Sequence, residues 1–147
     1  MTDPSTRKEW MAVLAQADAQ ALVAALDGLG PRPSHQWLRA PEIGAVMVRG
    51  RAGGTGAPFN LGEMTVTRCT LRLDDGSVGH AYIPGRDKAK AEAAALCDAL
   101  LQGPEADQVQ TGVIRPLQSA ADAARRKTAA KAEATKVDFF TMVRGEG

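Results

Sequence analysis

The chain has 147 residues, of which 44% are hydrophobic and 24% are charged. This size and balance predict one globular domain spanning residues 1–147, able to fold without disulfides or a metal. Lys and Arg total 18 against 17 Asp and Glu, so the net charge of +1 lacks the excess that is typical of proteins coating nucleic acid. A polar opening and the lack of an apolar stretch of roughly 20 residues predict a cytoplasmic protein without a membrane span.

Residues 6–31 predict two short helices. Thr6 and Glu9 have capping-box spacing, in which a hydroxyl and a carboxylate satisfy the first free amides, so the first helix should begin at Thr6. Asp18 can cap the second helix. Apolar residues recur in it at helical spacing: Leu22, Ala25, Leu26 and Leu29. Glycines and a proline within 28–31 should end it.

The middle of the chain has the character of an antiparallel sheet of three or four strands. Residues 43–49 and 65–73 are rich in β-branched and apolar side chains and are separated by glycines. Asp75-Gly76 predicts a hairpin turn, because this pair tolerates the positive φ that tight turns require. Residues 77–83 would then form the returning strand.

A two-residue loop at Asp75-Gly76 sets the register of this hairpin. Leu73 would face Val78, Leu71 would face His80, and Cys69 would face Tyr82. Leu71, Leu73 and Val78 would therefore share one buried face.

The sequence context of the two histidines, His35 and His80, does not indicate a catalytic role for either. The register puts His80 at the edge of the core without an acidic partner, and His35 is expected at the surface or a strand edge. The sequence has no recognisable Ser/His/Asp arrangement and no H-E-x-x-H motif, so the catalytic residues, if any, are unknown.

Two further helices are expected after the sheet. Asp87 can cap the first, whose apolar stripe comprises Ala93, Leu96, Cys97, Leu100 and Leu101. The second runs from about 117 to 136, and its expected inward positions are small: Ala120, Ala121, Ala124, Thr128 and Ala132. It has no aromatic residue for stacking, so nucleic-acid binding is not favoured. Cys69 and Cys97 have no metal-ligand spacing and should be buried thiols, so no metal is expected. The fold class is α+β.

Residues 49–56 form the most distinctive local motif. Glycine amides can turn toward an anion that flanking guanidiniums neutralise, which would make a phosphate-binding loop. The spacing is neither G-x-G-x-x-G nor a P-loop, so a plain glycine loop between strands is favoured by roughly three to one. The residues concerned, for substrate, phosphate or a protein interface, are Arg49, Arg51, Gly53, Gly54, Thr55 and Gly56.

Residues 137–145 concentrate apolar side chains near the end of the chain: Val137, Phe139, Phe140, Met142 and Val143. Left exposed, they would form a patch of a kind that soluble monomers generally avoid. Packing on the chain's own core and docking into a partner protein are about equally supported.

These motifs together resemble the PhnG family. The resemblance is carried by a central region, Arg51-Ala52-Gly53-Gly54-Thr55-Gly56 with Phe59, Gly62, Thr65, Thr67, Arg68, Leu71-Arg72-Leu73 and Asp75-Gly76. It is also carried by an opening helix around Trp10-Met11-Ala12-Val13-Leu14-Ala15, by Gly85-Arg86-Asp87-Lys88, and by a closing signature over 137–145. His80 departs from the family, which usually has an aromatic side chain there.

The resemblance implies a non-catalytic or accessory subunit of the bacterial carbon-phosphorus lyase core complex. The implied partners are PhnI-, PhnJ- and PhnH-type subunits, with ATP-binding-cassette subunits of the PhnK and PhnL types. The PhnI-type subunit, with its helpers, replaces the adenine of MgATP by an alkylphosphonate. MgATP is thus a substrate of the complex, and this chain is expected to bind no cofactor. The alternative is a self-sufficient small phosphate-ester or nucleotide-binding enzyme that uses the glycine loop.

Overall fold

The computed structural model describes the backbone of residues 4–51 and 56–146, and the side chains of residues 6–51, 56–59 and 61–133. In chain order the elements are α1 (Pro4–Gln16), α2 (Ala19–Asp27), β1 (His35–Arg51), β2 (Pro58–Leu73), β3 (Val78–Pro84), α3 (Lys88–Leu100), α4 (Ala106–Val109), the π-helix η2 (Gln110–Ile114) and α5 (Arg115–Glu146). The fold is α+β, as predicted.

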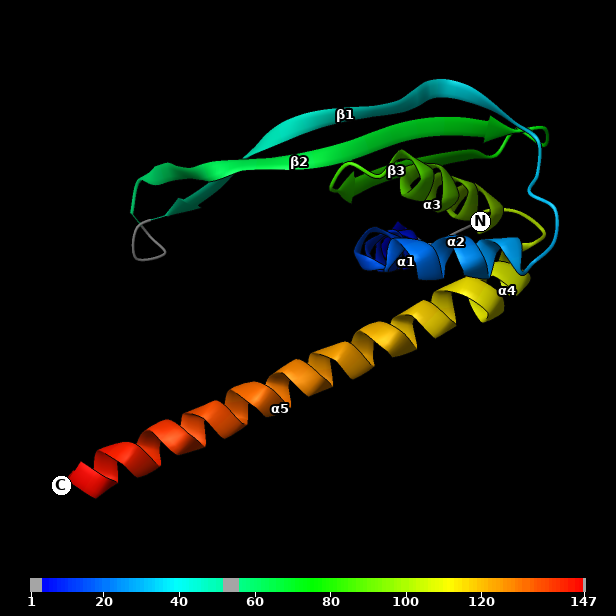
Figure 1. The fold of residues 1–147 in the computed structure, drawn as a ribbon. Helices are drawn as coiled ribbons and strands as arrows, with labels where there is room; N and C mark the ends of the chain where they lie inside the picture. The colour runs from blue at the N-terminus through cyan, green and yellow to red at the C-terminus, as the bar shows by residue number, and fades with distance from the viewer. Residues whose placement is uncertain (1–3, 52–55, 147) are drawn as a thin grey trace.

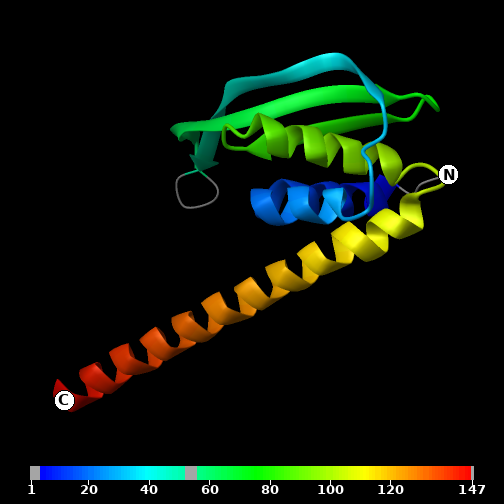
Figure 2. The same ribbon diagram turned by 45° about the vertical axis from the view of Figure 1, so that its right-hand side comes forward.

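The elements are stacked in layers (Figure 1). The described strands form one three-stranded antiparallel sheet in the order β1-β2-β3. Helix α3 covers one face of this sheet, α2 packs against α3, and α1 contacts both α3 and β3. Helix α5 leaves this stack and extends far beyond it (Figure 2).

Helix α3 is the centre of the core, because it is buried toward the sheet and toward the other helices. The predicted stripe is confirmed: Ala93, Leu96, Cys97, Leu100 and Leu101 are all buried. Its alanines allow a very close approach to β3. A Cβ added at Gly79 would lie 2.0 Å from the Ala95 carbonyl oxygen, so only glycine fits there.

The caps of the first helices are partly as predicted. Asp18 caps α2, with its carboxylate accepting a hydrogen bond from the Ala21 amide at 3.0 Å, and Asp87 caps α3 in the same way. The capping box at Thr6 is wrong, because α1 begins at Pro4 and Thr6 lies inside its first turns. Proline suits a first helical position, since its missing N–H would have no partner there anyway.

The predicted register of the β2–β3 hairpin is wrong by one residue. The Leu73 amide donates to the Ser77 carbonyl at 2.9 Å, which leaves a three-residue loop with Gly76 at φ 93°. Leu71 therefore pairs with Gly79. A one-residue shift moves every side chain of the strand to the other face.

This shift changes which residues are buried. Leu71 and Leu73 lie in the core as expected, together with Ala81 and Ile83 of β3. Val78 and His80 point to the opposite face, where His80 pairs with Thr70 rather than with Leu71. His80 is therefore a surface residue and not one at the edge of the core.

The C-terminal helix differs most from the expectation. It runs on from α4 through η2, so the helical path begins well before residue 117. Leu117 is buried, but four of the residues expected to face inward are exposed: Ala120, Ala124, Thr128 and Ala132. A small alanine side chain offers too little apolar area to hold a helix against the body.

Candidate functional site

Strands β1 and β2 continue past the end of β3. Pairing with β3 stops at Val66, which faces Pro84, whereas β2 extends to Pro58. Residues 43–51 and 58–65 therefore form a two-stranded arm, called the ribbon below, that reaches beyond α1, α2 and α3 (Figure 1). The strands expected at 43–49 and 65–73 are confirmed, but both are longer than predicted.

Over the body of the molecule, the sheet face turned away from α3 carries several polar side chains alongside Tyr82 and Val78. This outer face carries hydrogen-bonded pairs: Glu42 accepts from Arg39 and from Arg68, each at 2.9 Å, and Arg72 donates to Gln36 at 3.1 Å. The Arg68 hydrogen bond lowers the pKa of Glu42. The charged side chains of this part of the outer face are thus hydrogen-bonded to neighbours on the same face.

The same face becomes apolar along the ribbon. Because pairing is regular from Glu42 to Val48, Val46 and its partner Met64 point outward, on the side of Arg68. A Cβ built on Gly50 would lie 3.1 Å from Leu61 Cδ1 and 3.4 Å from Phe59, so these two side chains lie over Gly50. The outer apolar surface comprises Val46, Val48, Phe59, Leu61 and Met64.

Much of this outer apolar surface is open to solvent. Phe59 is 46% exposed and Leu61 63% exposed, and on the other side of the ribbon Met47 is 52% exposed. Single exposed apolar residues are normal, but a contiguous apolar surface on a projecting arm is a feature of protein interfaces. We therefore take the ribbon as a candidate docking site.

Arg51 and Gly56, which flank the centre of the glycine loop, lie at the tip of this ribbon. Arg49 and Arg51 are exposed residues of β1, and the Arg51 guanidinium donates to the Gly56 carbonyl at 3.2 Å. Gly53, Gly54 and Thr55 lie outside the described residues. The plain-loop and phosphate-binding interpretations of residues 49–56 both stay predictions.

Helix α5 is a second projecting element. Every side chain from Ala123 to Glu133 is exposed, and the helical backbone continues to Glu146. At roughly 1.5 Å per residue, residues 123–146 extend about 36 Å. The backbone of the predicted docking segment 137–145 continues this helix rather than forming a separate tail. The side chains of Val137, Phe139, Phe140, Met142 and Val143 lie outside the described part, so their docking role stays a prediction.

A buried polar cluster that the sequence did not reveal holds the body together. The side chain of Asp98 on α3 is 0% exposed. Its Oδ1 accepts from Arg7 Nε at 3.2 Å and Trp10 Nε1 at 2.8 Å, and its Oδ2 accepts from Arg7 Nη2 at 2.8 Å and the His80 amide at 2.9 Å. Asp98 also raises the pKa of Arg7 through its hydrogen bonds. Asp98 thus joins α1, α3 and β3.

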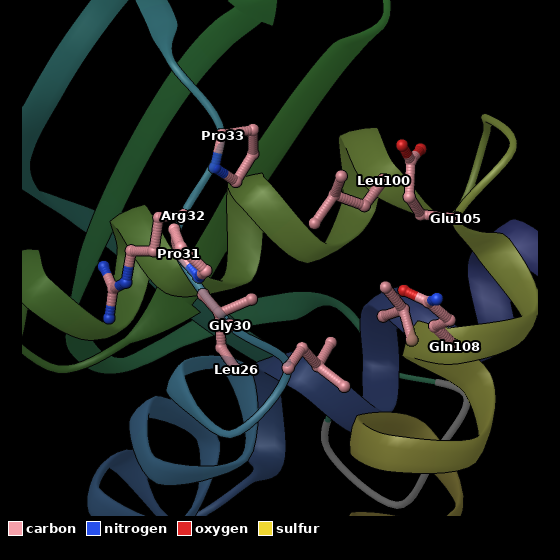
Figure 3. A pocket seen from close by; sticks show the side chains of 10 residues that line it. Leu26, Gly30, Pro31, Arg32, Pro33, Leu100, Glu105 and Gln108 are labelled. Carbon is pink, nitrogen blue, oxygen red and sulfur yellow. The ribbon is translucent and has the colours of Figure 1, made fainter.

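A small hollow lies between the end of α2 and α4 (Figure 3). It measures about 140 Å³ and is lined by residues that include Leu26, Pro31, Arg32 and Glu105. The Arg32 guanidinium lies away from Glu105 and donates to Asp27 at 2.9 Å. Small-molecule sites usually measure roughly 300–1,000 Å³, so this hollow does not define a ligand site.

The fold and these surfaces define a small α+β domain whose ribbon and C-terminal helix both extend away from its core. Within the described ranges, no helix has the length and apolar character needed to cross a membrane. These features belong to the class of proteins that work in contact with other chains.

Comparison with known proteins agrees with this class. Residues 5–145 match the family described as phosphonate metabolism protein PhnG. The chain is also 46% identical, over 140 residues, to the alpha-D-ribose 1-methylphosphonate 5-triphosphate synthase subunit PhnG of Rhizobium meliloti (strain 1021). That alignment covers 95% of this chain and 90% of the relative. The chain belongs to the PhnG family, which confirms the resemblance found in its motifs.

Proposed function

We propose that this chain is an accessory, non-catalytic subunit of a carbon-phosphorus lyase core complex in organic phosphonate utilisation. The complex would transfer the ribose triphosphate moiety of MgATP to an alkylphosphonate and release adenine. The observation that carries this proposal is the match to the PhnG family over residues 5–145, supported by a relative named as a synthase subunit.

The geometry supports an accessory role for this chain. Asp98 is committed to four hydrogen bonds within the fold, and His80 Nδ1 lies 3.1 Å from the Thr70 hydroxyl on an exposed strand face. Neither residue is placed as one of a general acid and base pair. The extensive features are instead the ribbon and α5, which suit contacts with other subunits.

The partners that fit this role are PhnI-, PhnJ- and PhnH-type subunits, with PhnK- and PhnL-type ATP-binding-cassette subunits in the same cytoplasmic assembly. MgATP would be a substrate of the complex, with no cofactor held by this chain alone. Docking would also stabilise this chain, because a partner that binds only the folded state shifts the folding equilibrium.

Residues 137–145 provide the first test. A tagged chain is expressed in a host grown on a phosphonate as phosphorus source, and the co-purifying chains are identified by mass spectrometry. Replacing both Phe139 and Phe140 by Ala should release the chain from the complex, because burying each Phe contributes roughly 1.5–3 kcal/mol. A matched double variant with Leu at both positions keeps most of the apolar area and should remain bound.

The outcomes separate the possible roles of this segment. Unfolding of the isolated Ala double variant, seen by circular dichroism, would mean that the segment completes the chain's own core. Full co-purification of a folded Ala double variant would remove the segment from the interface. If the wild-type chain captures no other subunit, the proposed function itself is wrong.

The glycine loop gives a second test, by calorimetry. The accessory role predicts no heat when MgATP is titrated into this chain alone, and weaker complex assembly for Arg51→Ala. Heat with the wild-type chain that disappears in Arg51→Ala would instead indicate direct phosphate binding and favour a nucleotide-binding enzyme. An Arg51→Ala variant normal in both measurements would remove the loop from either role.

A further inference from the structure

The outer edge of β1 is an open strand edge. In the sheet order β1-β2-β3, β1 pairs with β2 on one side, and no strand within the described residues pairs with its other side. An unpaired edge offers a row of N–H and C=O groups to any extended chain that can reach it.

The hydrogen bonds of β2 show which groups of β1 are free. The Thr65 carbonyl accepts from the Gly85 amide at 2.8 Å and the Leu73 amide donates to Ser77, so the odd-numbered residues of β2 bond toward the β3 side. Even-numbered residues therefore bond toward β1. Their partners in β1 are Gly44, Val46 and Val48.

It follows that Ile43, Ala45 and Met47 direct their backbone N–H and C=O groups to the open edge. Pairing with β2 is regular through this stretch, and the irregularities fall outside it, between Trp37 and Glu42 and between Val48 and Arg49. Residues 43–48 are thus a length of edge without a register shift, suitable for a complete ladder.

This edge lacks the usual protection against strand addition. Soluble proteins commonly block an exposed edge with lysine, proline or a bulge. Every cationic side chain of the three strands is an arginine, residues 42–51 contain no proline, and the bulges lie outside 43–48. Arginine in place of lysine is also the composition expected of a surface that is buried in an interface.

Residues 43–48 of β1 carry no polar side chain on either face of this edge, whereas their partners in β2 on the core-side face are Thr67, Thr65 and Glu63. Ile43 and Met47 are exposed on the side that continues the core face, while Val46, Val48 and Met64 form part of the outer apolar surface. A strand added at this edge would therefore lie beside apolar β1 side chains on both faces of the sheet. A segment with apolar side chains on both faces, belonging to the interior of another protein, fits this environment.

Charge decides between a second copy of this chain and a different partner. β1 exposes Arg39, Arg49 and Arg51, and its acidic residue Glu42 is already hydrogen-bonded to Arg39 and Arg68. Two copies paired through β1 would bring these arginine-rich strands together, and like charges on neighbouring strands are destabilising. A segment with acidic side chains beyond its apolar stretch would complement Arg49 and Arg51.

We propose that an extended, net acidic segment of another subunit adds to β1 as a fourth strand alongside Ile43, Ala45 and Met47. This inference rests on the proposed function and specifies how the subunit docks. Main-chain hydrogen bonds would give the affinity, and the two apolar faces would give the specificity.

The test uses the full chain co-expressed with the other subunits of the complex. Ala45→Pro removes an outward N–H and inserts a ring into the edge, while the bonds from Gly44 and Val46 to β2 remain. Its capture by the complex should fall by about tenfold or more. The matched variant Ala45→Val keeps the N–H and should bind as the wild type does.

Hydrogen exchange of the wild-type chain supplies a readout that needs no variant. The amides of Ile43, Ala45 and Met47 should exchange at least about tenfold more slowly in the complex than in the free chain, because they gain ladder hydrogen bonds. Unchanged exchange at these amides in an intact complex would overturn the strand addition while leaving the proposed function standing.

The remaining outcomes are equally decisive. Normal capture of Ala45→Pro would also overturn the inference, and so would protection of these amides in a homodimer of the chain without other subunits. Failure of the wild-type chain to join any complex would overturn the proposed function together with this inference. Slower exchange of the Ile43, Ala45 and Met47 amides in the complex, together with weaker capture of Ala45→Pro but not of Ala45→Val, would establish β1 as the docking edge.

Discussion

Replacing Asp98 by Asn tests the cluster that joins α1, α3 and β3. The change keeps the shape of the side chain but turns one acceptor oxygen into an NH₂ donor. Each carboxylate oxygen accepts two hydrogen bonds, one from Arg7 and one from either Trp10 or the His80 amide. Whichever way the amide is oriented, two donors will therefore face an NH₂ group.

The expected cost follows from these contacts. One hydrogen bond from the charged Arg7 is lost, which usually contributes roughly 1.5–3 kcal/mol, and one buried donor is left unsatisfied, which costs about 1–3 kcal/mol. The Arg7 side chain is 31% exposed and can regain water, so its share is at the lower end. We expect the free energy of unfolding to fall by about 2–4 kcal/mol.

Urea unfolding of the full chain, followed by tryptophan fluorescence, measures this change. Asp122→Asn is the matched control, because Asp122 pairs with Arg125 on the surface of α5 and such exposed pairs contribute roughly 0–1 kcal/mol. A loss below about 0.5 kcal/mol for Asp98→Asn, or equal losses for the two variants, would refute the account of Asp98 as the residue that joins three elements.

Three further predictions concern the core. Gly79→Ala should prevent stable folding, because the added Cβ would lie 2.0 Å from the carbonyl oxygen of Ala95 in α3. The control Gly44→Ala, whose Cβ would have nothing within 4 Å, should leave the melting temperature nearly unchanged. Equal melting temperatures for the two variants would contradict the close packing of Gly79 on α3. Leu71→Ala should lower the unfolding free energy by about 2–5 kcal/mol in denaturant titration, and a change near zero would reject its burial. Burial raises the pKa of Cys69 from 9.0 to about 11 and that of Cys97 to about 12, so both thiols should resist alkylation in the native state. Fast alkylation of the native protein at pH 8 would contradict the burial of these thiols. Because the two thiols ionise at lower pH in the unfolded chain than in the folded one, the free energy of unfolding should fall as the pH rises above about 9.

The candidate site could be predicted only in part. The composition of residues 49–56 and 137–145 indicated two candidate contact segments, one at the end of β1 and one near the end of α5. Clusters of glycine with arginine, and of phenylalanine with other apolar residues, can be recognised without knowing the fold. The outer apolar surface was not predicted, since Val46, Met64 and Leu61 come together only through the pairing of β1 with β2. No local pattern indicates how far two strands continue beyond the third.

The fold was predicted where local chemistry decides. Asp18 and Asp87 cap helices because a carboxylate can reach an amide three residues on, and this depends on a few neighbouring residues alone. The apolar spacing of α3 was likewise sufficient to predict its buried stripe. Family membership was also recognisable, because many short motifs occur in one order along the chain.

Only the tertiary structure decided what distant contacts control. A three-residue loop and a two-residue loop both suit Asp75-Gly76, and the choice depends on which register buries Leu71 and Ile83 beneath α3. In the sequence, Asp98 is indistinguishable from an ordinary polar helix residue. Its role follows only from the packing of α1 and β3, which places Arg7, Trp10 and the His80 amide against it. The sequence by itself thus determined the elements and the family, because those signals are short-range, whereas register, burial and the open edge of β1 depend on groups far apart in the chain.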